Sequence, residues 1–148
     1  MLKGLLDQSL ITLNIIASDW EDAVRKASQP LVDNGKVEQS YIEDMVAGVK
    51  QYGPYIVLTK HVALPHARPE SGAKQCALGV ATLAHPVEFG NAENDPVKYL
   101  FPLAATDNSS HLSALADLAE LFDDKDFFEM LDNATSVSQV IDYLNKRN

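Results

Sequence analysis

The chain has 148 residues, close to the commonest size of a globular domain, and its 46% hydrophobic content is typical of globular proteins. We therefore expect a single domain over residues 1–148, with a core that needs neither disulfides nor a metal. Its 12 Lys and Arg residues are outnumbered by 21 Asp and Glu residues, which gives a net charge of −9. This charge argues against nucleic acid as a ligand, and it leaves open whether the acidity serves a basic protein partner or solubility alone.

The cysteine content and the hydropathy point to the cytoplasm. Cys76 is the only cysteine, so no internal disulfide can form and nothing requires an oxidising compartment. Asp7 and Gln8 interrupt the apolar N-terminal stretch, and about 18 consecutive apolar residues occur nowhere. We expect a cytoplasmic protein without a signal peptide and without insertion into a membrane.

The first third of the chain indicates a strand followed by two helices. Residues 10–16 (LITLNII) are strand-like, and apolar residues then recur at helical spacing up to about Gly35 and again up to Gly53. Two capping boxes predict where these helices begin: Ser18 with Glu21, and Ser40 with Glu43.

The rest of the chain indicates strands and then helices. Short, β-prone apolar runs predict strands at 55–58, 77–84, 86–89 and 97–105. Helical spacing predicts a helix that begins at Ser109 or Ser110, a short helix around 127–131, and a last helix opened by a Ser136/Gln139 capping box.

Helices at both ends of the chain with strands between them predict an α/β fold, a layered sandwich whose central sheet is flanked by helices on both faces. The strands at 77–84 and 86–89 are too close in sequence for a crossover helix, which favours at least one antiparallel pairing. We therefore expect a mixed sheet, parallel in part and antiparallel in part.

The segment with the clearest chemical potential is residues 58–72, LTKHVALPHARPESG. Pro65 and Pro69 exclude regular helix or central strand around His66, which predicts a stiff, irregular loop. An imidazole that is neutral near physiological pH, beside the Arg68 guanidinium, suits phosphoryl transfer. An ordinary exposed histidine is the alternative that loop chemistry alone leaves open.

Two stretches favour a functional His66 over an ordinary exposed histidine: GPYIVLTKHVALPHARPESGA (53–73) and ENDPVKYLFPLAATDNSSHLSALADLAELFDD (93–124). They resemble the mannitol/fructose type of phosphotransferase system (PTS) IIA domain, and most of all its ascorbate branch. The resemblance covers nearly the whole chain. It implies that His66 is the phosphorylated residue and that His111, at the start of a helix, stacks near it and stabilises the phosphoryl group. For His111, a solvent-facing position at the helix start is the alternative.

The resemblance also implies partners. The phosphoryl group would arrive from phospho-HPr, reside on Nε2 of His66, and leave to a cysteine of a IIB component, with the membrane IIC component involved only indirectly. No cofactor is implied, and no nucleotide-binding motif such as GxxxxGK[ST] occurs. The carbohydrate would be L-ascorbate or a related compound. Physical reasoning adds that the other ring nitrogen must donate to an acceptor, for which we expect a backbone carbonyl.

The chain departs from the pattern at one point. Mannitol-type members carry an arginine ahead of the active histidine, where this sequence has Gly48, Val49 and Lys50. Lys50 or Arg68 could replace it, or the anion site could be weaker. Arg68 could also pair with Glu70 on the loop surface.

The remaining candidates are weaker. We expect His61 at the surface or in a pocket wall, His85 solvated in a turn before Pro86, and Cys76 packed in the core on a buried strand. A zinc site of His61, His66 and His111 has no supporting ligand spacing, so we expect no metal.

Two other hypotheses compete with a phosphoryl relay. One is a regulatory binding module of the same fold, read by a partner through the phosphorylation state of its histidine. The other is a structural domain that is never phosphorylated, in which replacing His66 would change only surface charge.

Overall fold

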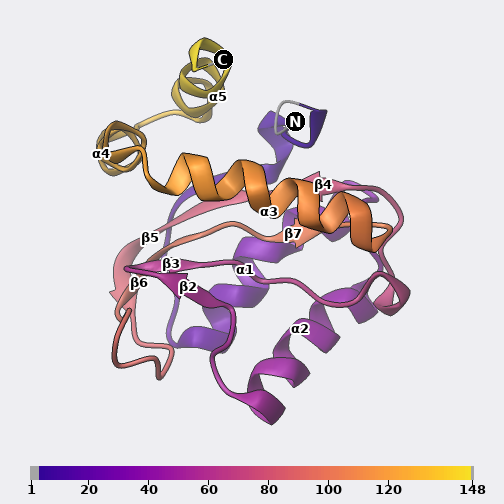
Figure 1. Cartoon of the computed structure of the whole chain (residues 1–148). Coiled ribbons are helices and arrows are strands. Elements are labelled where there is room, and N and C mark those ends of the chain that lie inside the picture. Colours follow the sequence, from indigo (N-terminus) through magenta and orange to yellow (C-terminus); the bar gives the residue numbers. More distant parts are fainter. Residues whose placement is uncertain (1–3, 148) are drawn as a thin grey trace.

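The computed structural model describes residues 4–147, and its centre is a five-stranded mixed sheet (Figure 1). The strand order is β1-β5-β6-β3-β2. The strands are β1 (Ile11–Ile15), β2 (Val57–Thr59), β3 (Val62–Ala63), β5 (Val80–Val87) and β6 (Val97–Leu100). A separate two-stranded sheet pairs β4 (Ala77–Leu78) with β7 (Leu103–Ala104).

The pairing confirms the predicted mixture of strand directions. β1 with β5 and β3 with β6 are parallel, whereas β5 with β6 and β2 with β3 are antiparallel. The predicted origin of the antiparallel pairing was wrong, because 77–84 and 86–89 are not two partner strands. Residues 80–87 form the one strand β5, and its antiparallel partner is β6.

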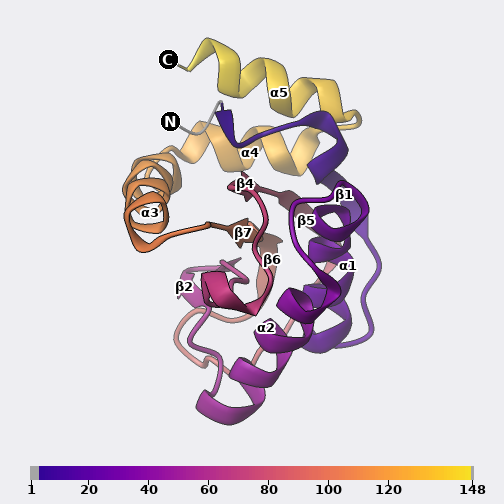
Figure 2. The same cartoon turned by 90° about the vertical axis from the view of Figure 1, so that its right-hand side faces the viewer.

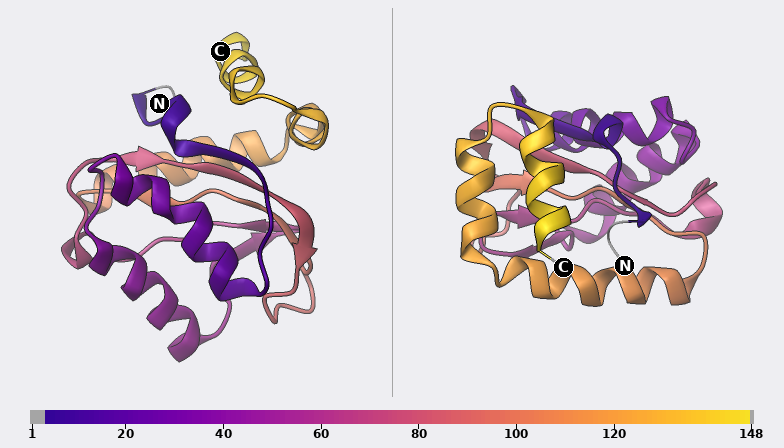
Figure 3. Two further views of the ribbon diagram at one scale, coloured as in Figure 1. Left: turned by 180° about the vertical axis from the view of Figure 1, so that it is seen from behind. Right: turned by 90° about the horizontal axis from the view of Figure 1, so that it is seen from above.

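Helices cover both faces of the sheet, as predicted (Figures 2 and 3). α1 (Trp20–Asp33) and α2 (Gln39–Tyr52) lie on one side, and α3 (Asn108–Phe122), α4 (Lys125–Asn133) and α5 (Val137–Lys146) lie on the other. Ala81 and Leu83 of β5 belong to the core on the α1 and α2 side, and Val80 belongs to the opposite core. Burial on both faces explains why this strand is apolar without alternation.

Two of the three predicted capping boxes were misplaced. Asp19, rather than Ser18, caps α1 and accepts from the Asp22 backbone N–H at 2.8 Å. α2 begins at Gln39, with Glu38 as its N-cap and without a side-chain cap, and Ser40 lies inside the helix and donates to the Ser71 carbonyl oxygen at 2.7 Å. The box of α5 is present as predicted. The local patterns thus misplaced the first two N-caps by one or two residues.

His85 lies in β5 and not in the predicted turn, although its side chain is exposed as expected. The last β1 pairing is Ile15 with Leu83, so this end of β5 has lost its β1 neighbour. The register with β6 also shifts between Thr82 and Val87. Pro86, which cannot donate to a ladder, is accommodated at this irregularity.

Candidate functional site

The chain after β3 forms the base of the site. It continues between the residue before β2 and the start of β7: the Leu64 N–H donates to the Ile56 carbonyl at 2.8 Å, and the Leu103 N–H donates to the Pro65 carbonyl at 2.9 Å. His66 follows in neither helix nor strand, as the two prolines predicted. A short 3-10 helix from Pro69 to Ser71 ends the loop.

A buried tyrosine ties this loop to the fold. The Tyr41 hydroxyl, on α2, lies 2.8 Å from the Leu103 carbonyl oxygen and 3.1 Å from the Ala67 carbonyl oxygen. Burial raises the pKa of Tyr41 to about 12, so the hydroxyl keeps its proton and remains a donor. The residue next to His66 is therefore held against both α2 and the strand region.

The His66 ring is half-buried, and one of its nitrogens is engaged. Nδ1 lies 2.7 Å from the carbonyl oxygen of Leu64. A carbonyl can only accept, so Nδ1 carries the hydrogen and the lone pair of a neutral ring is on Nε2. This is the backbone-carbonyl acceptor that the sequence reasoning required. In a neutral ring, Nε2 is therefore the nitrogen that is free to accept a bond.

His111 lies beside His66. It belongs to the first turn of α3, which begins at Asn108 with Asp107 as its N-cap, earlier than the predicted start at Ser109 or Ser110. The His66 and His111 ring centroids are 5.3 Å apart at an interplanar angle of 48°. Burial, with a smaller contribution from the charge of His66, lowers the pKa of His111. Its position beside His66 differs from the alternative of a ring facing solvent.

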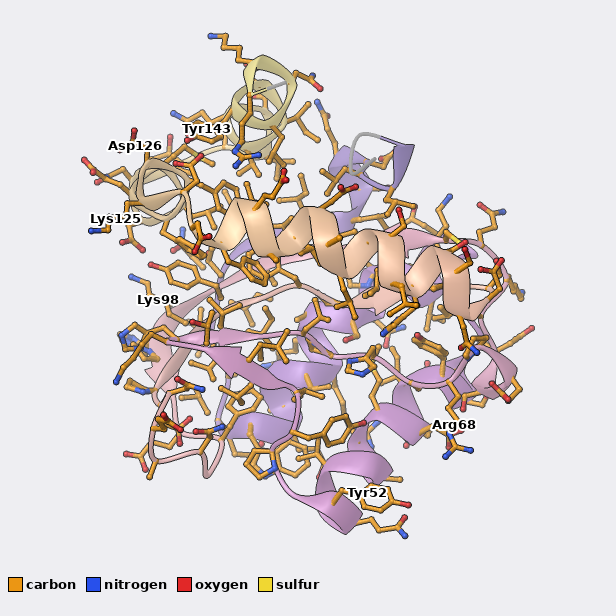
Figure 4. All side chains as sticks on the ribbon, in the orientation of Figure 1. Tyr52, Arg68, Lys98, Lys125, Asp126 and Tyr143 are labelled. Carbon is orange, nitrogen blue, oxygen red and sulfur yellow. The ribbon has the colours of Figure 1, made fainter. Side chains whose placement is uncertain are left out.

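These residues surround a pocket of about 380 Å³. Its lining is aromatic and polar: Tyr52, Tyr55, His66, Ala67, Arg68, Pro69, Asn108 and His111. Figure 4 shows Tyr52 and Arg68 at the same lower edge of the molecule, from the end of α2 and from the His66 loop. The positive end of α3 and the Arg68 guanidinium make this pocket suitable for an anion.

Comparison with known proteins identifies the family. The model for the phosphoenolpyruvate-dependent sugar phosphotransferase system, EIIA 2, matches residues 4–147. The chain belongs to this family. It is a PTS EIIA component, and a role in phosphoryl transfer follows from that membership.

The similarity to individual EIIA proteins extends over almost the full length. The chain is 34% identical over 146 residues to the ascorbate-specific PTS system EIIA component of Escherichia coli (strain K12), covering 98% of this chain and 95% of that protein. Among solved structures, it is similar to the mannitol-specific cryptic phosphotransferase enzyme IIA CmtB from Escherichia coli, with 33% identity, a TM-score of 0.82 and coverage of 96% and 97%. It is also similar to the complex of enzyme IIAMTL and phosphorylated enzyme IIBMTL from Escherichia coli, with 28% identity, a TM-score of 0.83 and coverage of 95% and 97%.

The structure distinguishes the two candidate cations near the His66 loop, Lys50 and Arg68. The Lys50 ammonium lies 3.1 Å from a carboxylate oxygen of Glu21 on α1, and Lys50 does not line the pocket around His66. Arg68 does line it and is exposed. The alternative pairing of Arg68 with Glu70 is not formed, since the described residues place no carboxylate within 4.0 Å of Arg68. Of the two candidates, only Arg68 lines the pocket around His66.

The other sequence candidates lie outside this EIIA pocket. His61 is exposed in the hairpin turn between β2 and β3 at φ 69°, with Nδ1 2.7 Å from the Pro96 carbonyl oxygen, so the pocket-wall alternative was wrong. Cys76 precedes β4 and is half-buried, with its sulfur 3.5 Å from the Thr106 hydroxyl oxygen. The prediction that it packs in the core on a buried strand was therefore wrong. Within residues 4–147 no cluster of three or more metal-ligating side chains occurs, and no helix is both long and apolar enough to cross a membrane.

Sequence reasoning missed two tyrosines of the EIIA site. Tyr41 lies in a predicted helix, but nothing in the sequence indicated which carbonyls its hydroxyl would meet. Tyr55 was assigned to a strand, yet it precedes β2, and its ring lies 5.7 Å from the His66 ring at an interplanar angle of 88°. Only for Tyr55 did the sequence hold a hint of its position outside the strand, because Tyr55 directly follows the turn formed by Gly53 and Pro54.

Proposed function

We propose that residues 1–148 form one IIA domain and that this domain is a cytoplasmic phosphocarrier. It accepts a phosphoryl group from phospho-HPr on His66 and passes it to a cysteine of a IIB component. The observation that carries the proposal is the 2.7 Å contact between His66 Nδ1 and the Leu64 carbonyl oxygen. It fixes the tautomer in which Nε2 is the nucleophile.

The same nitrogen, Nε2 of His66, accepts the phosphoryl group in the first transfer step and releases it in the second. In the first, a P–N bond forms at Nε2 as the bond between phosphorus and the donor breaks. In the second, that P–N bond breaks as the IIB cysteine, attacking as its thiolate, forms a P–S bond. The hydrogen stays on Nδ1, where it is donated to the Leu64 carbonyl oxygen, in both steps, so the loop itself needs no proton transfer.

His111 and Arg68 are the proposed stabilisers of the phosphoryl oxygens. The transition state of phosphoryl transfer spreads negative charge over three oxygens, which hydrogen-bond donors and cations stabilise. His111 is adjacent to His66, and Arg68 lines the same pocket. The first turn of α3 adds backbone N–H groups on the same side.

The surface around the pocket is suited to transient protein partners. Tyr52, which lines the pocket, and Leu112, which follows His111 in the sequence, are 71% and 66% exposed. The net charge of −9 complements a basic partner such as HPr. The complex of a mannitol IIA with its phosphorylated IIB, to which this chain is similar, supports a IIB component as acceptor. The membrane IIC component would take part only through IIB.

Incubation with phosphoenolpyruvate, enzyme I and HPr tests the relay. We expect a mass increase of one phosphoryl group and a phosphorus NMR signal of an Nε2-linked phosphohistidine. His66→Ala should abolish labelling, whereas His85→Ala, which removes an exposed imidazole on β5, should label like the parent protein. Labelling that persists in His66→Ala, or its absence from the parent protein, would remove the proposal.

L-ascorbate is the carbohydrate that the relatives favour, since the matched EIIA component of Escherichia coli is ascorbate-specific. The IIA domain does not contact the sugar, so the choice is made by the IIB partner. Phosphorylated protein should transfer its phosphoryl group faster to an ascorbate IIB component than to a mannitol IIB component. Equal rates would leave the phosphocarrier role intact and remove the ascorbate assignment.

A further inference from the structure

Gly48 is a glycine in the interior of α2, four residues before the helix ends at Tyr52. Glycine is the poorest helix former after proline, so an interior glycine needs a reason in packing. The reason here is steric. A Cβ built on Gly48 would lie 2.9 Å from the Tyr55 hydroxyl oxygen, closer than side-chain carbons approach such atoms.

The chain reverses after α2 in a way that brings Tyr55 back to Gly48. Gly53 adopts φ 88° at the end of the helix, and the Tyr55 N–H donates to the Gly53 carbonyl at 2.8 Å. A residue with a side chain would be strained at that φ. The Tyr55 side chain therefore folds back along the last two turns of α2.

The Tyr55 ring also contacts the proposed nucleophile. Its centroid is 5.7 Å from that of His66, and the two rings are almost perpendicular, at 88°. Perpendicular pairs at this separation are a preferred aromatic geometry. His111 packs against the same imidazole at 5.3 Å. The His66 ring thus has an aromatic neighbour from α3 and another from the segment after α2, in addition to its bond to Leu64.

We infer that Gly48 and Tyr55 form a matched pair, in which the missing side chain on α2 lets the Tyr55 ring settle against His66 and hold the imidazole in its transfer orientation. Tyr55 is thus a positioning residue that acts through His66. The inference rests on the proposed function, because orientation matters only if Nε2 receives a phosphoryl group. In-line transfer is sensitive to displacement, and a shift of about 1 Å can slow a reaction by about a hundredfold.

A set of four variants tests the pair. Gly48→Ala should push the Tyr55 ring and slow transfer from phospho-HPr about tenfold, with KM for HPr unchanged. Tyr55→Phe keeps the ring and should remain within about twofold of the parent. In the double variant the clash is gone, because the next Tyr55 atoms lie 3.6 and 3.7 Å from the added Cβ, and the rate should be restored. Tyr55→Leu removes the ring without altering α2 and should be as slow as Gly48→Ala.

A second readout does not depend on phosphorylation. The Tyr55 ring current should shift the His66 ring-proton resonances in the unphosphorylated protein, and Gly48→Ala and Tyr55→Leu should both change those shifts. A slow double variant, or a Gly48→Ala protein with parent rates and parent shifts, would overturn the inference. Failure of the proposed function is distinguishable, since the parent protein itself would then not be labelled on His66.

Thermal unfolding distinguishes a displaced Tyr55 ring in Gly48→Ala from a general loss of stability. Alanine is a better helix former than glycine, so α2 should not be weakened by Gly48→Ala. A midpoint equal to or above that of the parent, combined with slower transfer, is the expected result. A fall in the midpoint that accounts for the lost rate would contradict the positioning role.

Discussion

Tyr41→Phe tests whether the His66 loop is held by one buried hydroxyl. The side chain is 1% exposed, and its hydroxyl lies 2.8 Å from the Leu103 carbonyl oxygen and 3.1 Å from that of Ala67. Phenylalanine keeps the ring and removes the donor. A buried carbonyl left without a donor costs about 1–3 kcal/mol, so we expect a loss of about 2 kcal/mol in the free energy of unfolding. For a chain of this size that lowers Tm by about 4–8 °C.

The same substitution should slow phosphoryl transfer, because Ala67 is adjacent to His66 and its carbonyl loses a tether. We expect a rate lower by about tenfold at temperatures where the variant is folded. Tyr143→Phe is the matched control. It removes a hydroxyl that donates to Asp124 at 2.7 Å, and Figure 4 shows Tyr143 far from Arg68, at the other end of the molecule. It should lower Tm and leave the transfer rate unchanged. The reasoning is refuted if Tyr41→Phe melts like the parent or if both variants slow transfer equally.

Three further predictions concern stability. The pKa of His111 is lowered from its ordinary value of 6.5, so the unfolded state binds more protons than the native state as pH falls through that value. Denaturant titrations should show stability declining below about pH 6.5, and a His111→Asn variant that keeps the whole decline would contradict this cause. Ser28→Ala should raise the unfolding free energy by about 0.5–1 kcal/mol, because its fully buried hydroxyl has no hydrogen-bond partner among residues 4–147; a loss of stability would mean that the hydroxyl is satisfied. Gln139→Ala should cost about 1 kcal/mol, since its side-chain oxygen accepts from the Ser136 N–H at 3.0 Å, and an unchanged denaturation midpoint would exclude a working capping box.

Features that depend on neighbouring residues in the sequence were predictable. The helical spacing of apolar residues before Gly35 and Gly53 predicted α1 and α2, and Val24, Leu31 and Met45 of these helices are buried. The prolines on either side of His66 excluded regular structure there. The need for a fixed tautomer predicted a carbonyl acceptor for the ring, although not that Leu64 would supply it. Each of these conclusions follows from backbone sterics or hydrogen-bonding chemistry over a few residues.

By itself, then, the sequence determined the helices, the irregular loop of His66 and the family, because their signals are local or lie in residue identity. Only the tertiary structure decided the strand order, the pairing of Lys50 with Glu21 and the contact of Tyr55 with His66. Ser40 illustrates the reason: its hydroxyl does not form the predicted capping box, and it donates to the carbonyl of Ser71, 31 residues away. A side chain bonds to whatever partner the packed fold brings within reach, and sequence spacing does not encode that distance.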